Sequence, residues 1–462
     1  RGKVHESFAV YINYLQYYIV EMRRDIQYSP VNGPQPKPSV VYFVVPIIII
    51  AGTILIIWQL QPPEPSPFAH CPKSKYFDPE TASLLKTDTQ PDATSEGVVD
   101  IEWTHFTEYP RGNQDAAGAM YKHQLFSTGG FCGDNAFPYY CEPRGFFTDT
   151  YLYSFESHTW NRVQDMPGLG RQGHKCETID DEVYCMGGFS YSSPYSHVDS
   201  YKYNGTWHRI ADTPTNHTAA VQICTMNKKI YLLESGYYTV QNETGMFYVS
   251  DKLFQYTVAS DSWSQISTLP GTPRWSTDIT CVNNEIYVLG GVSGNHISYD
   301  VATNSNNQNI YRTIIDNWKY NVDSNTWNRL LDTPLVIGNW MFQHYYEGFI
   351  FLIGGAGYKE IRNDTEVTIP TNMNLPHSDL NVNVANDHLF TNNVYVYDTQ
   401  QDVFIHSTPL PYDWNGATTW LKDSVLYLSA GELGMICTEE YFFPRHPKMT
   451  LQGKITIKKP HL

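Results

Sequence analysis

Short apolar runs recur along the C-terminal three quarters of the chain, and each ends in a glycine pair or a near variant of one. The six signals, 48 to 76 residues apart, are Gly129-Gly130, Gly187-Gly188, Ser235-Gly236, Gly290-Gly291, Gly354-Gly355 and Ala430-Gly431. Between them, polar and apolar positions alternate in short segments separated by Gly, Asn and Asp turns, which is typical of antiparallel strands. Self-similarity at this period is typical of propellers and solenoids.

An aromatic residue accompanies each repeat at the end of a Tyr- or Phe-rich segment. The aromatics that follow the first five signals are Trp160, Trp207, Trp263, Trp327 and Phe404. The sixth signal has none, whereas Trp103 precedes the first signal without a glycine pair of its own. Signals and aromatics match only if the two ends of the repeat region share one unit. We therefore predict an all-β fold, a closed six-bladed propeller. In it, the strand around Ile101–Trp103 completes a last blade that otherwise spans about Ala417 to Phe443.

The repeat unit resembles the kelch repeat, in which a glycine pair is followed by a tyrosine and then a tryptophan, with a period near ~50 residues. The matching residues are Gly187-Gly188, Tyr201 and Trp207 in one unit, and Gly290-Gly291, Tyr320 and Trp327 in another. The third and sixth units depart from the pattern, with Ser235 and Ala430 in place of the first glycine. The resemblance covers about residues 99–443 and implies a kelch-type β-propeller.

A stretch of 21 uncharged residues runs from Val40 to Leu60. As a helix it is about 31 Å long, which matches a hydrocarbon core of about 30 Å. We predict residues 39–60 as an N-terminal transmembrane helix, with a cleaved signal peptide as the alternative. More Lys and Arg flank its N-terminal side, and all eight cysteines lie C-terminal to it. Both features favour a signal-anchored type II single-pass membrane protein with the propeller extracellular or lumenal.

Composition sets the remaining boundaries. Residues 1–38 are predicted as a cytoplasmic tail, for which a helix is one reading, and residues 61–98 as a stalk rich in Pro, Ser and Thr. Residues 444–462 are predicted as a basic C-terminal tail. The net charge is −16 overall and −18 for the region after the span. An acidic propeller argues against nucleic acid as a partner, because phosphates are repelled.

The chain has no HExxH, GxSxG or P-loop motif, and its 16 histidines lack metal-ligand spacing. We therefore expect no catalytic residue, metal or cofactor, and a binding module for a protein or glycan rather than an enzyme. Two enzyme alternatives stay open on the same scaffold. The resemblance to kelch proteins allows a galactose-oxidase-like copper enzyme, and Arg111, Arg171 and Arg274 allow a sialidase-type glycosidase. A structural subunit of a larger membrane complex is a further alternative.

Cysteine spacing predicts disulfides. The segment CETIDDEVYC folds about Asp180-Asp181 as a two-residue turn, which places Cys176 opposite Cys185 in a hairpin. Cys132 and Cys141 bracket a loop and are predicted to close it. The other four cysteines allow three pairings. By location we favour Cys71–Cys437, which would join the stalk to the closing blade, and Cys224–Cys281, which would link neighbouring blades.

Four sequons for N-glycosylation fall in predicted loops on the side assigned to the outside or the lumen. They begin at Asn204, Asn216, Asn242 and Asn363.

Arg, Asn and Trp recur where the chain enters each blade, in loops that share one face of a propeller. We select from them a candidate binding face, since Arg and Trp are typical binding anchors. The candidates are Arg111, Arg171, Arg274, Trp275, Trp340 and Trp414. Capping and packing roles are the alternative for these residues. The loops between second and third strands reach the same face and are long in three repeats. We expect partner contacts to concentrate on Phe131–Phe147 and Ala356–Asn393.

Overall fold

The computed structural model describes residues 98–458 apart from several internal segments. The segments outside the description are 133–144, 242–243, 294–298, 301–304, 307–311, 334–340, 358, 363–364, 368–388, 391, 412–413 and 439–440. The predicted tail, anchor and all but the last residue of the stalk also lie outside the described residues. Within the described part of the chain, no helix is long and apolar enough to span a bilayer.

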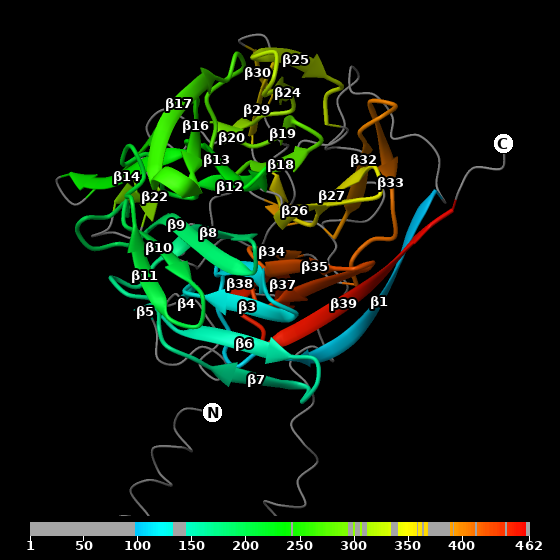
Figure 1. Cartoon of the computed structure of the whole chain (residues 1–462). Helices are drawn as coiled ribbons and strands as arrows, with labels where there is room; N and C mark the ends of the chain where they lie inside the picture. The colour runs from blue at the N-terminus through cyan, green and yellow to red at the C-terminus, as the bar shows by residue number, and fades with distance from the viewer. Residues whose placement is uncertain are drawn as a thin grey trace, which may run out of the picture. The chain divides into compact units, whose positions relative to one another are not determined.

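Six antiparallel sheets of four strands surround a common axis as the blades of a propeller (Figure 1). Blade 1 comprises β2 (Ala117–Tyr121), β3 (Gln124–Thr128), β6 (Thr150–Ser154) and β7 (Thr159–Arg162), and blade 2 comprises β8 (Gln172–Ile179), β9 (Glu182–Phe189), β10 (Ser200–Tyr203) and β11 (Trp207–Ile210). Blade 3 comprises β12 (Gln222–Met226), β13 (Lys229–Leu233), β16 (Lys252–Thr257) and β17 (Ser262–Thr268), with a 3₁₀ turn η2 (Val258–Ser260). Blade 4 comprises β18 (Asp278–Val282), β19 (Glu285–Leu289), β24 (Asn317–Asn321) and β25 (Thr326–Leu330). Blade 5 comprises β26 (Met341–Tyr346), β27 (Phe349–Ile353), β32 (Val394–Asp398) and β33 (Val403–His406).

Blade 6 joins the two ends of the propeller, as the aromatic count predicts. Its sheet order is β35 (Thr418–Lys422), β36 (Val425–Ser429), β39 (Met449–Ile457) and β1 (Val99–Glu108), and the pair β1 and β39 lies side by side in Figure 1. The innermost strands contact one another around the whole ring, from β2 through β35 and back to β2. The ring of blades is therefore closed.

The boundary predicted at residue 443 is too early. The third strand of blade 6 is β39, which lies within the stretch 444–462 predicted as a tail, and it separates β1 from β36. In its register Ile101 pairs with Ile455 and Trp103 pairs with Gly453. The prediction missed this strand because MTLQGKITI has neither a glycine pair nor an aromatic residue. Its buried and exposed positions do alternate through the second half, as in a half-buried strand.

The glycine pairs hold neighbouring blades together through their backbone. The second glycine of a pair donates its N–H to a carbonyl at the entrance of the next blade, from Gly130 to Arg171 and from Gly188 to Thr218. Gly130 has a φ of +101°, and a Cβ there would lie 2.7 Å from the side-chain nitrogen of Asn113. Only glycine fits both the left-handed backbone and this approach.

In blades 3 and 4, the tyrosine and tryptophan of the repeat pack as a ring pair between the third and fourth strands. Tyr256 and Trp263 have centroids 5.0 Å apart, and Tyr320 and Trp327 repeat that separation. The tyrosine hydroxyl also donates to the left-handed residue of the following turn, as Tyr256 does to Asp261 at 2.6 Å. These aromatics bury area in the wedge between blades.

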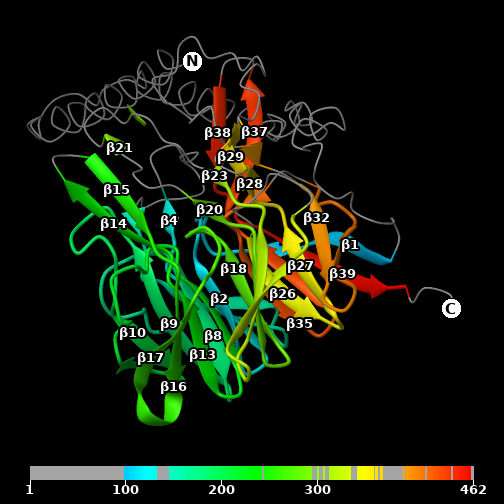
Figure 2. The same ribbon diagram turned by 90° about the horizontal axis from the view of Figure 1, so that it is seen from above.

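One face of the propeller carries additional strands between the second and third strands of five blades, and we call this layer the crown (Figure 2). Its strands over blades 1 and 3 are β4 (Phe131–Cys132), β5 (Gly145–Phe146), β14 (Gly236–Gln241) and β15 (Thr244–Val249). Those over blade 4 are β20 (Val292–Ser293), β21 (Tyr299–Asp300), β22 (Ser305–Asn306) and β23 (Arg312–Thr313). Those over blade 5 are β28 (Ala356–Gly357), β29 (Lys359–Arg362), β30 (Thr365–Val367) and β31 (Leu389–Phe390). Over blade 6 lie β37 (Glu432–Thr438) and β38 (Tyr441–Arg445), which pair with the entrance strand β34 (Trp414–Asn415).

Two disulfides follow the predicted pairing. Cys176 is bonded to Cys185 across the β8–β9 hairpin, where the two residues are register partners, with a Cα–Cα distance of 4.1 Å. Cys224 is bonded to Cys281 and joins the innermost strands of blades 3 and 4. Cys132 is also disulfide-bonded. Its predicted partner Cys141 lies outside the described residues. The predicted pair Cys71–Cys437 remains a prediction, because the description does not extend to those side chains.

Candidate functional site

The polar residues that recur at the blade entrances share one structural role. In four blades, the loop that enters the blade contains a residue with a left-handed backbone, which we call the entrance residue. The side chain two positions before it donates a hydrogen bond to the backbone carbonyl of the first residue of the glycine signal in the same blade. The donor and acceptor pairs are Asn113 to Gly129, Arg171 to Gly187, Arg274 to Gly290 and Trp414 to Ala430, with lengths of 3.1, 3.3, 3.0 and 2.7 Å. Guanidinium, amide and indole N–H groups can all fill this position, which explains why the residue type varies around the ring.

Arg171 and Arg274 also form buried ion pairs within their own blades. The Nη2 atom of Arg171 lies 2.6 Å from Asp199 Oδ2, and that of Arg274 lies 2.8 Å from Asp316 Oδ2. Burial would raise the pKa of Asp199, but the hydrogen bond and charge of Arg171 outweigh it and hold that pKa below its usual value. The arginines are 1% and 0% exposed. A ligand on the face therefore cannot reach either guanidinium.

The other four candidates for the binding face differ in how deeply they are buried, and one of them is not described. Trp414 is fully buried. Arg111 is mostly buried, pairs with Asp149 across 2.8 Å, and stacks on Phe147 with its Cζ atom 3.9 Å from the ring centroid. Trp275 is half-buried and forms a backbone bridge with Val292. Trp340 lies outside the described residues. The selected residues therefore do not form an open array of anchors, and the capping alternative accounts for Arg171, Arg274 and Trp414.

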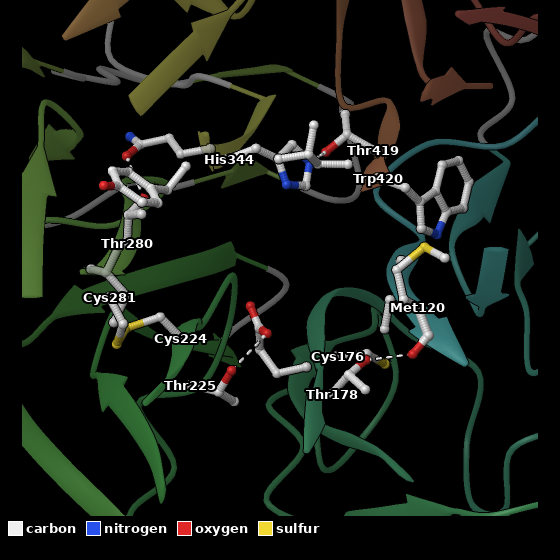
Figure 3. A pocket seen from close by; sticks show the side chains of 17 residues that line it. Met120, Cys176, Thr178, Cys224, Thr225, Thr280, Cys281, His344, Thr419 and Trp420 are labelled. Atoms are coloured by element: carbon white, nitrogen blue, oxygen red, sulfur yellow. Dashed lines mark hydrogen bonds between the residues drawn. A yellow bond between two sulfur atoms is a disulfide. The ribbon is translucent and has the colours of Figure 1, made fainter. Parts of the chain in front are cut away.

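A cavity of about 370 Å³ occupies the central channel, with at least one lining residue from each of the six innermost strands (Figure 3). Contacts between neighbouring strands surround it. Thr178 Oγ1 donates to Met120 O at 2.6 Å, Thr225 Oγ1 to Glu177 Oε2 at 3.3 Å, and Thr280 Oγ1 to Gln343 Oε1 at 3.3 Å. His344 Nε2 and Thr419 Oγ1 are 2.8 Å apart, and Trp420 Nε1 donates to Phe126 O at 2.8 Å. With the Cys224–Cys281 bond, these contacts join all six blade boundaries.

A group of ionisable and amide side chains lies where blades 6, 1 and 2 meet on the crown face, and we call it the mouth cluster. Its members are Asp115, Glu432, His446, Lys175, Gln114 and Gln172. Asp115 has a φ of +52° and occupies the entrance position that Gly173 and Gly416 fill in blades 2 and 6. A side chain at Gly416 would place its Cβ 2.9 Å from Asp115 Oδ1. The carboxylate therefore lies directly against the neighbouring backbone.

The mouth cluster perturbs the acidity of its central carboxyl group. Burial, then the charge of Glu432, raise the pKa of Asp115 from 3.8 to about 6, although a hydrogen bond from Gln114 and the charges of His446 and Lys175 oppose this. Gln114 Nε2 donates to Asp115 Oδ2 at 3.0 Å, and His446 Nε2 lies 3.7 Å from Glu432 Oε1. A carboxyl group that titrates near neutral pH can both donate and accept a proton.

The mouth cluster was not predicted from the sequence. Asp115 stands in an unremarkable run, GNQDAAG, and its partners come from three other segments of the chain. An alignment of the loops that enter the blades could have identified it. Asp115 is the one charged residue among the left-handed entrance positions that the structure describes. The others are Gly173, Ala220, Ser276 and Gly416.

A serine, a histidine and an aspartate meet in blade 2, but their geometry does not suit nucleophilic catalysis. Ser190 Oγ lies 3.0 Å from His197 Nε2, and His197 Nδ1 lies 3.9 Å from Asp199 Oδ1. Ser190 and His197 are each 1% exposed, and the Ser190 hydroxyl donates to Ser192 O. The serine proton is thus directed away from the histidine, and no substrate reaches it. We assign these residues to the packing of the loop.

Two of the four predicted sequons lie in described loops, and their asparagines are exposed. Asn204 occupies the turn between β10 and β11, and Asn216 lies in the loop that leads into blade 3. Asn242 and Asn363 lie outside the described residues. No group of three or more His, Cys, Asp or Glu side chains within the described ranges has metal-binding geometry.

Known proteins share the repeat and the fold of this chain. The profile of the kelch motif matches residues 170–214, which correspond to blade 2. Blade 2 thus carries a kelch motif, and the fold as a whole is a six-bladed β-propeller. The solved structure of YjhT has the same fold, with a TM-score of 0.52 and 13% identity over 76% of this chain and 99% of that one. At this identity the likeness concerns the fold alone.

Two curated proteins that resemble this chain in sequence are named for different functions. The Rab9 effector protein with kelch motifs from Danio rerio is 25% identical over 35% of this chain and 48% of its own length. N-acetylneuraminate epimerase from Salmonella typhi is 22% identical over 56% of this chain and 59% of its own length. The chain thus spans about half the length of the relatives it matches.

Proposed function

We propose that this kelch propeller is a recognition module that binds a protein partner through the crown, on the extracellular or lumenal side of a membrane. The observation that carries the proposal is the difference between the two faces. On the face opposite the crown, strands are joined by two-residue turns such as Asp180-Asp181 and Asn283-Asn284. On the crown face, five blades carry additional strands, and insertions on one face of a repeat fold often build the binding site.

Backbone pairing between blades makes the crown a connected platform. Strand β15 of blade 3 pairs with β21 of blade 4, and β23 of blade 4 pairs in parallel with β29 of blade 5. A surface ordered before binding loses less entropy on association than free loops do. Blade 2 closes without a crown hairpin, so these strands are not needed to complete a blade.

An exposed aromatic residue lies beside the crown hairpin of blade 1. Tyr191 is 53% exposed, and its ring lies 5.4 Å from that of Phe131 and 4.9 Å from that of Phe146. Leu169, in the loop that leads into blade 2, is 47% exposed. Among the described residues, Tyr191 and Leu169 are the large apolar side chains that are exposed. Aromatic residues held by rigid neighbours are typical anchors of protein interfaces.

Other evidence supports a binding role outside the cytoplasm. The uncharged segment 40–60, the cysteine distribution and the exposed sequons favour the outer or lumenal side. One curated relative is named as an effector protein. The arginines that suggested a sialidase-type site are used otherwise, because Arg171 and Arg274 are each paired with an aspartate of their own blade. A glycan ligand is the alternative occupant of the same face.

Photo-cross-linking in the full chain tests this proposal. A photoreactive amino acid is placed singly at Tyr191 and Ser250 on the crown side, and at Asp181 and Asp423 on the opposite face. The proposal predicts protein adducts from the first pair and not from the second. Adducts confined to Asp181 and Asp423 contradict it, and adducts to carbohydrate alone favour the glycan alternative over a protein partner.

A further inference from the structure

The outer edge of β14 is open in the crown sheet that covers blades 3 and 4. The strand order of this sheet is β14-β15-β21-β22, and Figure 2 shows β14 beside β15 at the margin of the crown. The edge faces away from blade 4, toward blade 2, which contributes no crown strand within the described ranges. One bridge joins Gly236 to Ala219, in the loop from blade 2 to blade 3. Beyond that bridge, no described strand pairs with this edge.

The bridge defines which backbone groups of β14 lie along the open edge. Gly236 donates its N–H to Ala219 at 3.4 Å and accepts from the N–H of Ala219 at 2.8 Å. In antiparallel strands such groups alternate between the two edges, so the N–H and C=O groups of Tyr238 and Val240 point the same way as those of Gly236. The groups of Thr239, between them, point to β15. Two N–H and two C=O groups therefore lie on the open edge.

The sequence of β14 does nothing to protect this edge. The strand Gly236–Gln241 reads GYYTVQ, with no charged residue and no proline, and its six residues make it the longest edge strand of the crown in the described part of the chain. The other crown edges have two or three residues, except β38, which contains Pro444 and Arg445. Proteins commonly protect strand edges with charges, prolines or short lengths. The contrast indicates that β14 has a pairing partner.

The outermost strands of the blades lack this combination of features. Strands β1, β7, β11 and β25 carry charged residues, and β33 has four residues. The pairing of the uncharged strand β17 with β16 is interrupted by a register shift, which is another common protection of an edge. Among the described edges, β14 is therefore the one best suited to accept a further strand.

The geometry of the edge suits a second copy of the same chain. An antiparallel edge is complementary to itself about a two-fold axis. With the axis beside Thr239, Tyr238 of each copy lies opposite Val240 of the other, and each such pair exchanges two hydrogen bonds. Two N–H groups from each copy thus make four bonds between the copies. No outward N–H or C=O group of Tyr238 or Val240 is then left without a partner.

Charge and apolar patterning favour the same occupant. The chain has a net charge of −16, so two copies repel one another over much of their surfaces. Strands β14 and β15 contain no charged residue and avoid this repulsion. By register, Tyr238 and Val240 share one face of the hairpin with Phe247 and Val249. Pairing of two hairpins joins these apolar faces across the axis.

We propose that two copies of this chain pair antiparallel through β14 and form a dimer. Its crown sheet runs without interruption from one copy to the other, in the order β21-β15-β14-β14-β15-β21. The dimer does not depend on the proposed crown partner, since it requires only this chain.

Disulfide trapping in the full chain tests the register. In the dimer, Thr239 of one copy lies opposite Thr239 of the other as a non-hydrogen-bonded pair, with Cα atoms about 4.5 Å apart, which is within disulfide range. We expect Thr239→Cys to give a covalent dimer on mild oxidation, seen on a non-reducing gel. Gln241→Cys is the matched control on the same strand. Its two copies are offset by four residues, about 13 Å, and should not cross-link.

Sedimentation equilibrium of the full chain in detergent measures the association itself. We expect the parent to dimerise at chain concentrations of about 1–100 µM. Val240→Pro removes an outward N–H and spares the bonds to β15, and Thr239→Lys places like charges opposite each other. Each should weaken the dimer about tenfold or more. An equal mixture of Thr239→Lys and Thr239→Glu should restore association, because opposite charges then meet across the axis.

Three results overturn the proposal. The first is a parent chain that stays monomeric up to about 100 µM. The second is equal cross-linking of Thr239→Cys and Gln241→Cys. The third is association that Val240→Pro and Thr239→Lys both leave unchanged, which would place the contact elsewhere in the chain. Circular dichroism shows whether each variant is folded, and if Val240→Pro is not, the lysine and glutamate variants carry the test. Failure here is distinguishable from failure of the crown interface, because a cross-linked dimer has twice the mass of the chain.

Discussion

The backbone N–H of Gly431 donates a hydrogen bond to the carbonyl oxygen of Asn113 across 2.6 Å, and this contact joins the last blade to the first. The same bond recurs from Gly130 to Arg171 between blades 1 and 2. Asn113 in turn donates its side-chain amide to the glycine pair of its own blade. Asn113 thus links two blades. Its carbonyl binds the glycine signal of blade 6, and its side-chain amide binds the glycine pair of blade 1.

Gly431→Ala tests this link. Gly431 has a φ of +82°, and a Cβ there would lie 2.6 Å from the backbone nitrogen of Ala417. We expect a loss of about 3 kcal/mol or more in the free energy of unfolding, measured by urea denaturation. Gly348→Ala is the control, because Gly348 also has a positive φ of +95° but no atom within 4 Å of an added Cβ. Its cost is the backbone strain alone, about 1–2 kcal/mol. Equal losses in the two variants would show that the close contact has no part in stability.

Arg274→Met removes the donor from an entrance of blade 4. It leaves the Gly290 carbonyl and the Asp316 carboxylate without this partner inside the protein. We expect a loss of about 3–5 kcal/mol, since breaking a buried pair leaves an uncompensated charge. Arg209→Met is the matched control, because Arg209 pairs with Asp212 at the surface and each side chain is about half exposed. That change should cost less than about 1 kcal/mol.

Asp115→Asn should make the protein more stable at neutral pH. The folded-state pKa of Asp115 is raised from 3.8 to about 6, so the folded protein binds this proton more tightly than the unfolded chain. Its contribution to stability is complete below about pH 4 and is lost as the pH rises through about 6. The variant lacks this loss, and we expect it to gain up to about 3 kcal/mol relative to the parent at pH 7. Melting temperatures of the two proteins from pH 4 to 8 measure the difference, and curves that stay parallel over that range contradict the assignment.

The two disulfides should differ in their contribution to stability. Cys224–Cys281 closes a loop of 57 residues and Cys176–Cys185 a loop of 9. By loop-closure entropy, replacing the first pair with serine should cost about 4 kcal/mol and replacing the second about 2.5 kcal/mol. Chemical denaturation of the two double variants under oxidising conditions gives the comparison. A larger loss for the short loop would mean that native-state packing, and not chain entropy, dominates.

The periodic signals were sufficient to predict the ring, because glycine pairs and aromatics occupy positions where the backbone leaves few alternatives. Gly130 needs both a left-handed φ and close contact with Asn113, so its identity is readable in the sequence. The Cys176–Cys185 pairing was readable for a similar reason, since the turn at Asp180-Asp181 sets the register. Strand β39 was not, because a strand of alternating Thr, Leu and Ile is distinguished only by its partner strands.

The site was less accessible to sequence reasoning than the fold. The sequence pattern places Arg171 and Trp414 in loops on one face of the propeller. Each side chain instead turns inward and donates to a buried carbonyl of the glycine signal in its own blade. Sequence alone does not distinguish a buried donor from an exposed anchor. The mouth cluster was missed because Asp115, Lys175 and Glu432 come together only when blades 6, 1 and 2 close.

The central claim, that the crown is the recognition surface, is tested most directly by capture of partner protein with the full chain and with a chain that lacks Lys359–Asn386. This deletion removes β29 and β30, and with them the pairing of β29 to β23 that connects the crown over blades 4 and 5. We predict that capture falls at least about tenfold while the melting temperature stays within a few degrees of the parent, because the ring strands are intact. Undiminished capture by a folded deletion variant would contradict the account.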